Sequence, residues 1–243
     1  MSMRARAAVA GLAFLAAMAF LSFHAAAQGE GSVERGKKIF LDTGPKEYPD
    51  YPSCAQCHTT VPAAKEAETG HIRPGHSLYN VTARPSFKNK PKGKGPKTAG
   101  DAGNICVRAF QKRKALPPEK VADLNAYLQS ISTGESAKPL KIGYAPRLMK
   151  DLDGGDKTKG KKKYEIYCTT CHGDADDDIY VALKPGRWNR VKVLRKARGY
   201  IPDKRKEAGV RFKANNGMMS FFAEDRLPDA DLRDILAYVG KIK

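Results

Sequence analysis

The sequence predicts an all-α protein made of two tandem domains with the same plan. A five-residue motif, CxxCH, occurs twice, at residues 54–58 and 168–172. An amphipathic segment follows each motif, and the apolar residues of the first segment recur in the second at a constant offset of 111 residues. A short segment that begins Gly-Lys-Lys precedes each motif, at residues 36–40 and 160–164. One copy of each feature in each half indicates a duplicated helical domain.

The amphipathic segments predict the closing helix of each half. They follow Leu116-Pro117-Pro118 and Leu227-Pro228-Asp229, and proline is well tolerated at a helix start. Their apolar residues fall at helical spacing. These residues are Val121, Leu124, Leu128 and Ile131 in the first copy, and Leu232, Ile235, Val239 and Ile242 in the second.

Each CxxCH motif is a candidate site for covalent haem attachment. The two thiols can form thioethers with the haem vinyl groups, and the adjacent histidine can bind the iron. The attachment residues would be Cys54, Cys57, Cys168 and Cys171, with His58 and His172 as iron ligands. A single CxxCH is also compatible with a zinc site or a redox dithiol. Two copies, neither with a second Cys/His pair at finger spacing, favour two haem c groups.

The order of these features is the layout of a class I cytochrome c domain: a first helix, CxxCH, loops that supply a second iron ligand, and a closing helix. We therefore expect two tandem class I cytochrome c-like domains, each around one covalently attached haem. Residues 28–131 are predicted to form domain 1, and residues 157–243 domain 2. Residues 132–156, with several glycines and prolines, are predicted to be a linker. Residues 42–52 are predicted to be a surface loop.

The fifth cysteine, Cys106, belongs to neither motif and is the candidate distal ligand of the first haem. It follows His58 by 48 residues, just before the closing helix. Met218 and Met219 follow His172 by 46 and 47 residues, at the equivalent place. Met219 is preferred, because the run from Met219 to Phe222 is similar to the Met-Pro-x-Phe run common in cytochromes c.

These two ligands predict different redox properties. A methionine thioether favours ferrous iron and raises the potential, so haem 2 is expected to be a high-potential carrier. A cysteine thiolate delivers negative charge to the iron and lowers the potential of haem 1. In the alternative interpretation Cys106 is a buried thiol, and His71 or His76 completes a bis-histidine haem 1. A lone exported thiol is exposed to oxidation, which favours Cys106 as a ligand.

Residues 1–27 are predicted to form a signal peptide. Arg4 and Arg6 precede an apolar stretch, and Ala25-Ala26-Ala27 offers a small-residue cleavage site ahead of Gln28. An uncleaved membrane anchor is the alternative, but the stretch is short and alanine-rich. We expect cleavage near Ala27/Gln28, export to the periplasm, and no membrane span in the mature protein.

The chain is strongly basic, with a formal net charge of +18. Removal of residues 1–27 takes away two arginines and no acidic residue, which lowers the charge to +16. In an exported protein this charge favours an anionic small substrate or an acidic redox partner over nucleic acid. Arg84, Lys88 and Arg108 are near Cys106 in the sequence and are candidates for holding an anion.

At these residues the chain resembles the diheme thiosulfate dehydrogenases, and more distantly the diheme subunit of the thiosulfate-oxidising multienzyme system. The matching runs are Asn104-Ile105-Cys106, Lys114-Ala115-Leu116 and, upstream, Pro85-Ser86-Phe87. The insertion before the first CxxCH is similar too. Methionine rather than cysteine as the expected ligand of haem 2 favours the dehydrogenases over the multienzyme subunit.

The resemblance implies an oxidoreductase that converts thiosulfate to tetrathionate at haem 1. In this scheme Cys106 is catalytic, because it leaves the iron or forms a sulfur adduct. Electrons pass one at a time through haem 2 to a soluble or membrane-bound acceptor, such as another cytochrome c. Two other functions stay open. One is a pure electron-transfer diheme cytochrome c, and the other is a subunit of a multi-protein thiosulfate-oxidising complex.

Overall fold

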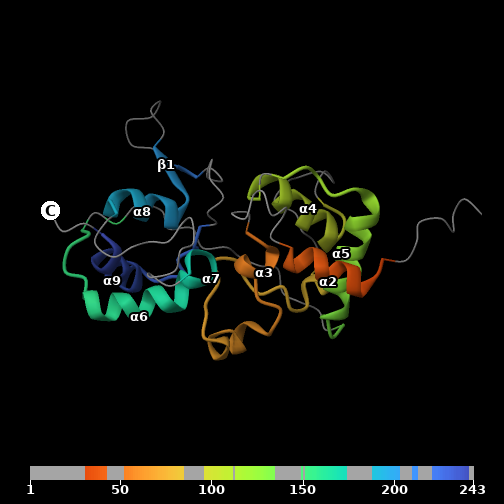
Figure 1. The fold of residues 1–243 in the computed structure, drawn as a ribbon, viewed down its shortest axis with the longest axis horizontal. Coiled ribbons are helices and arrows are strands. Elements are labelled where there is room, and N and C mark those ends of the chain that lie inside the picture. Colours follow the sequence, from red (N-terminus) through yellow and green to blue (C-terminus); the bar gives the residue numbers. More distant parts are fainter. Residues whose placement is uncertain are drawn as a thin grey trace, which may run out of the picture.

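The computed structural model describes residues 31–42, 52–84, 96–111, 113–134, 149, 151–173, 188–202, 210–212 and 221–240. They form two helical bodies side by side, one from each half of the chain (Figure 1). The predicted signal peptide and most of the predicted surface loop and linker lie outside the described residues. Among the helices that are described, none combines the length and the apolar character needed to cross a bilayer.

The first half is built from α2 (Val33–Leu41), α3 (Cys54–Cys57), α4 (Ala99–Ala109) and α5 (Pro118–Ser130). Segment 59–84, between α3 and α4, contains the short turns η1 (Ala63–Lys65), η2 (Ala67–Thr69) and η3 (Val81–Ala83). Helix α5 packs against both α2 and α4. The buried core of this half consists of Phe40, Val81, Ala99, Leu124, Tyr127 and Leu128.

The second half is built from α6 (Lys157–Tyr167), α7 (Thr169–His172), α8 (Arg190–Arg198) and α9 (Asp229–Val239). Strands β1 (Tyr200–Pro202) and β2 (Val210–Phe212) pair antiparallel between α8 and α9. This strand pair is an addition that the sequence reading did not predict. The predicted closing helices are confirmed as α5 and α9, which begin beside Pro117 and Pro228.

A close helix contact at a glycine recurs in both halves. In the first half, a Cβ atom at Gly36 of α2 would collide with the carbonyl oxygen of Asp123 on α5. In the second half, a Cβ atom at Gly160 of α6 would collide with the carbonyl oxygen of Asp234 on α9. Only glycine lets the first helix and the closing helix approach this closely.

An aromatic pair next to this contact is also repeated. The rings of Phe40 and Tyr127 have centroids 5.3 Å apart at an interplanar angle of 52°. The rings of Tyr164 and Tyr238 have centroids 5.6 Å apart at 56°. Tilted pairs of this kind suit the aromatic quadrupole and add to the energy of burial. The first and closing helices are therefore locked together in the same way in the two halves.

Segment 59–84 joins the two halves. It leaves α3 and is the orange stretch below α3 and α7 in Figure 1. The Ile72 N–H donates a hydrogen bond of 3.0 Å to the carbonyl oxygen of Ile166 at the end of α6. Glu66, whose side chain is 2% exposed, accepts a bond from Arg226. These contacts place the loop of one half in the interface with the other.

Candidate haem sites

The first CxxCH motif forms α3, a single turn fixed by a capping box. The Gln56 N–H donates to Ser53 Oγ at 3.2 Å, and Gln56 Oε1 accepts from the Ser53 N–H at 2.7 Å. Such a reciprocal cap satisfies the amide groups that a short helix leaves without partners. Cys54 and Cys57 therefore lie on one rigid turn, and His58 follows directly.

The second CxxCH motif continues from α6 into α7. The Cys168 N–H donates to the Tyr164 carbonyl at 2.8 Å, and the His172 N–H donates to the Cys168 carbonyl at 2.9 Å. The hydroxyl of Tyr164 then donates to the carbonyl of Gly173 at 3.0 Å. Gly173 has a φ of 62°, a backbone conformation that favours glycine, and ends the turn. The motif is thus held to the helix that precedes it.

Contacts with segment 59–84 fix the orientation of the His58 imidazole. His58 Nδ1 lies 2.8 Å from the carbonyl oxygen of His76, and the Gly75 N–H donates to the Cys57 carbonyl at 2.7 Å. A Cβ atom at Gly75 would collide with the ring of His58. Burial is the main cause that lowers the pKa of His58. A neutral ring that donates its Nδ1–H to a carbonyl leaves the Nε2 lone pair for a metal.

The three thiols of the first half, those of Cys54, Cys57 and Cys106, lie close together. Burial raises the pKa of Cys54 to about 12, and neighbouring Cys106 and Cys57 add to the effect. Burial also raises the pKa of Cys106 to about 11, with a further contribution from Cys57. Cys106, a free cysteine, therefore shares one site with the two attachment cysteines. A thiol with so high a pKa is protonated at neutral pH. It binds a metal as the thiolate, so metal binding releases the proton.

An orphaned polar atom supports the fit of a cofactor at this site. Gln111 is 6% exposed, and its Nε2 lies 4.0 Å from Cys54 Sγ. Within the part of the chain that the structure describes, its Oε1 has no hydrogen-bond partner. A buried amide oxygen without a partner is rare and indicates a missing group. Two thiols, an oriented imidazole and this orphaned atom suit a covalently attached haem.

Cys106 lies on helix α4 and not in a loop, which is where the cytochrome c layout predicts the second iron ligand. Its helix starts at a capping box between Thr98 and Asp101. The glycines of α4 are not loop residues but its contact face: a Cβ atom at Gly100 would lie 2.5 Å from the Val121 carbonyl oxygen of α5. Because α4 is packed on the closing helix, the position of Cys106 is set by helix packing.

Asn104 connects the Cys106 helix to the start of the closing segment. Its Nδ2 donates to the Leu116 carbonyl at 3.2 Å, and its Oδ1 accepts from the Leu116 N–H at 2.7 Å. One side chain thus satisfies both backbone groups of one residue and closes the turn between α4 and α5.

The structure describes two of the three predicted anion-binding cations, Arg84 and Arg108. Arg84 donates to the Ser77 carbonyl at 3.1 Å and contributes to lowering the pKa of His58. Burial lowers the pKa of Arg84 itself. Arg108 is exposed on α4, and Lys88 lies outside the described residues. The sequence reading missed Arg113, which lowers the pKa of Cys54 and forms an ion pair of 2.9 Å with Asp42. Only the structure indicates this proximity.

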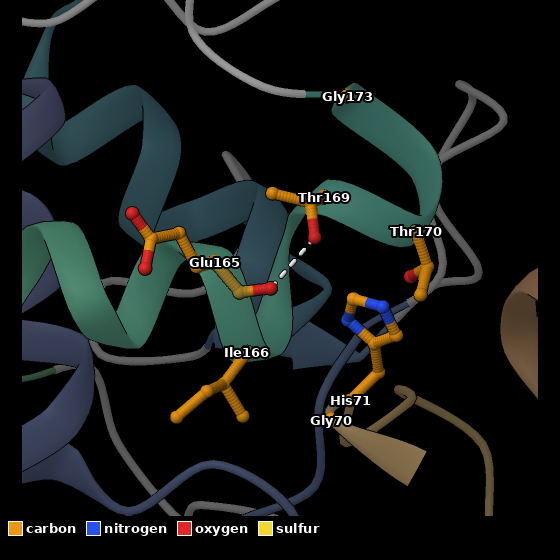
Figure 2. A pocket seen from close by; sticks show the side chains of 7 residues that line it. All are labelled: Gly70, His71, Glu165, Ile166, Thr169, Thr170 and Gly173. Carbon is orange, nitrogen blue, oxygen red and sulfur yellow. Dashed lines mark hydrogen bonds between the residues drawn. The ribbon is translucent and has the colours of Figure 1, made fainter.

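The imidazoles of His71 and His76 are both directed toward the second half. His76 Nε2 lies 2.8 Å from Asp225 Oδ2. His71 lines a cavity of about 490 Å³ together with Glu165, Ile166, Thr169 and Thr170 (Figure 2). Among the described residues, its buried Nδ1 has no hydrogen-bond partner. Both histidines therefore lie next to residues of the second half.

The candidate methionine ligands of the second haem, Met218 and Met219, lie outside the described residues. The chain re-enters the described part at Phe221. Phe222 is 5% exposed, and its ring packs edge-on against Tyr167 with centroids 5.9 Å apart. The Phe222 N–H also donates to the Ala197 carbonyl of α8 at 2.7 Å. The run that follows Met219 in sequence is thus anchored in the core of the second half.

The two attachment motifs face each other across the interface between the halves. The side-chain amide of Gln56 donates to the carbonyl of Thr170 at 3.0 Å, and Cys171 Sγ lies 3.8 Å from the carbonyl oxygen of Gln56. Helices α3 and α7 lie at the centre of the molecule in Figure 1.

Comparisons with known families agree with this architecture. Residues 33–132 match the family model described as cytochrome c. Residues 155–239 match the family model described as cytochrome C oxidase, cbb3-type, subunit III. A search of curated proteins found no match. Two cytochrome c domains in tandem, one around each CxxCH motif, make this chain a c-type cytochrome that transfers electrons with two covalently bound haem c groups.

Proposed function

We propose that this diheme cytochrome c oxidises an inorganic sulfur anion, thiosulfate, at haem 1 and passes the electrons through haem 2 to an acceptor. The observation that carries the proposal is the position of Cys106, a free cysteine that shares a half-buried site with Cys54 and Cys57. His58 and Cys106 would bind the iron of haem 1, and His172 and Met219 that of haem 2. The resemblance around Asn104 and Leu116 supports the same function.

The different ligands give the electrons a direction. A thiolate from Cys106 stabilises the ferric state and lowers the potential of the first site, whereas a thioether from Met219 raises the potential of the second. Electrons entering at the first domain would therefore move downhill to the second. The acceptor, soluble or membrane-bound, would be another redox protein such as a cytochrome c.

The substrate reaction balances without protons. Two thiosulfate anions lose one electron each and join through a new sulfur–sulfur bond as tetrathionate, and the two electrons leave one at a time. The formal charge of +16 that remains after removal of residues 1–27, 18 − 2, attracts such anions. Arg113, which acts electrostatically on Cys54, is a described cation close enough to the first site to attract an anion.

The proposal places the protein in the periplasm. The support is the sequence of residues 1–27, with Arg4 and Arg6 ahead of an apolar stretch and alanines before Gln28. Sequencing the N-terminus of the protein from its native host tests this placement. A mature chain that begins near Gln28 is expected, and one that keeps its initial Met1 contradicts cleavage.

Substitution of Cys106 tests the sulfur chemistry. The ferric wild type is expected to give the electron paramagnetic resonance spectrum of a low-spin, thiolate-bound haem, and Cys106→Gly is expected to lose it. The same variant should lose mediator-free reduction of the protein by thiosulfate. Ile105→Ala is the matched control, because Ile105 is the preceding residue of α4 and 53% exposed. Thiosulfate oxidation at the wild-type rate in Cys106→Gly would end the catalytic assignment of Cys106. A wild type that thiosulfate does not reduce without mediators would be a pure electron carrier.

A further inference from the structure

The two haem-attachment motifs touch through the residues between their cysteines. Gln56 is the second intervening residue of the first motif, and Thr170 holds the same place in the second. The Gln56 Nε2 donates to the Thr170 carbonyl at 3.0 Å, across 114 residues of sequence. Cys171 Sγ lies 3.8 Å from the Gln56 carbonyl oxygen. In each contact a side chain of one attachment turn reaches a backbone carbonyl of the other.

The Gln56 amide is fixed in orientation by two different partners. Its oxygen accepts from the Ser53 N–H at 2.7 Å and its nitrogen donates to the Thr170 carbonyl at 3.0 Å. The reverse orientation would place a carbonyl against a carbonyl and an amide N–H against an N–H. One side chain thus caps α3 and holds α7 at the same time.

The surrounding contacts hold this junction in register. The Arg73 guanidinium donates to the Ala55 carbonyl within the first motif at 2.8 Å. The Arg73 carbonyl accepts from Arg226 of the second half at 2.8 Å. Ile72 is bonded to Ile166 two residues before Cys168. Ile72 and Arg73 therefore form hydrogen bonds with the first motif and with the second half, next to the contact between the two motifs.

We propose that Gln56 is a positioning residue for electron transfer between the two haem sites, and that the electron crosses directly at the contact between α3 and α7. Electron tunnelling weakens steeply with separation, so a side chain that holds the two attachment turns together sets the transfer rate. In the transfer, one electron leaves the reduced site of one domain and reduces the oxidised site of the other, with no bond or proton exchanged. The inference rests on the electron-transfer function and not on thiosulfate as the substrate.

Gln56→Glu separates the two roles of this residue. The carboxylate still accepts from the Ser53 N–H, so the cap of α3 is kept, but it cannot donate to the Thr170 carbonyl and repels it. Gln56→Asn keeps the amide but is one methylene too short to reach both partners. Ser53→Ala is the matched control, because it removes the bond to the Gln56 N–H and leaves the bridge to Thr170 in place.

The test uses the full chain with both haems attached, confirmed by its absorption spectrum. Electron transfer between the haems is followed after photoreduction, and magnetic coupling between the ferric haems gives a second readout. In Gln56→Glu the transfer rate is expected to fall about tenfold, because loss of a hydrogen bond with added repulsion depopulates the closed contact. The magnetic coupling should weaken in parallel, and Ser53→Ala should match the wild type in both.

Two results would overturn the inference. One is an unchanged transfer rate and coupling in Gln56→Glu and Gln56→Asn. The other is an equal loss in Ser53→Ala, which would assign the effect to capping of α3. Failure of the proposed function is seen separately, as an absence of thiosulfate oxidation in a wild type whose transfer between haems is intact. If Gln56→Glu does not accumulate with both haems, the comparison of Gln56→Asn with Ser53→Ala decides.

Discussion

Loss of the ion pair between Glu66 and Arg226 is expected to uncouple the two halves. Arg226 Nη2 lies 2.5 Å from Glu66 Oε2, and the two side chains are 11% and 2% exposed. The other Glu66 oxygen accepts from the Arg73 N–H at 2.9 Å, and Arg226 also donates to the Arg73 carbonyl. The pair therefore links segment 59–84 of the first half to the residues just before α9 in the second half.

The magnitude follows from the burial of the charges. Removing one partner of a buried ion pair costs about 3–5 kcal/mol, because the other charge stays buried without compensation. In Arg226→Met the Glu66 carboxylate keeps only the Arg73 N–H, so we expect a loss of about 3 kcal/mol. Glu66→Gln leaves Arg226 with the Arg73 carbonyl, and the loss should be similar. The double variant should recover much of it, because neutral groups of similar volume often replace a buried pair at little cost.

Denaturant unfolding of the four proteins, followed by circular dichroism and haem absorption, gives the coupling energy in a double-mutant cycle. The single variants should also unfold in two steps, the halves having lost their shared contact. Asp225→Asn is the control within the same interface, because Asp225 is half-exposed and its contact with His76 should be worth less than about 1 kcal/mol. Single-variant losses no larger than the control, or losses that add in the double variant, would refute the buried-pair reasoning.

Three further predictions concern the scaffold and the first haem site. Gly36→Ala and Gly160→Ala should each lower the free energy of unfolding by about 1–3 kcal/mol through overpacking, measured by thermal unfolding; unchanged stability would contradict the glycine contact. The bonds from Arg35 and the Ser32 N–H lower the pKa of Asp123, so its stabilising effect is complete above the unfolded pKa of about 4 and is lost as the pH falls through the lower folded value. Unfolding at a series of pH values should show wild type and Asp123→Asn converging on acidification, and a constant difference would be inconsistent with it. Cys106→Met should raise the potential of haem 1 in a spectroelectrochemical titration while leaving haem 2 unchanged; no change would show that this sulfur is not a ligand.

The closing helices could be predicted because their information is local. Leu124 and Leu128 of α5, and Leu232 and Ile235 of α9, fall at helical spacing and are buried as the periodicity requires. The haem-attachment motifs were equally accessible, because their chemistry depends on five consecutive residues. The duplication could be predicted as well, because the motifs and the apolar residues of the closing helices recur in both halves of the sequence.

Helix α4 was not predicted, because its glycines locally favour a loop but in the fold allow a close contact between helices. Gly100 and Gly103 interrupt a helical pattern and locally favour a loop. In the fold they let α4 approach α5, where a Cβ atom at Gly103 would lie 2.8 Å from Leu124 Cδ2. Packing energy outweighs the weak local preference. The candidate ligand Cys106 was identified, but not the element that carries it.

The interface between the halves lies beyond any reading of the sequence, yet it decides how the two haem sites relate. The bridge from Gln56 to Thr170 and the ion pair from Glu66 to Arg226 join residues 114 and 160 positions apart. Within segment 59–84, the His76 carbonyl accepts a hydrogen bond from the His58 ring, and the His76 ring contacts Asp225 of the second half. The residue that orients the proximal imidazole of the first site is thus held by the second half. A duplicated domain with independent halves would not need this contact, so the structure favours one two-centre unit over two linked carriers.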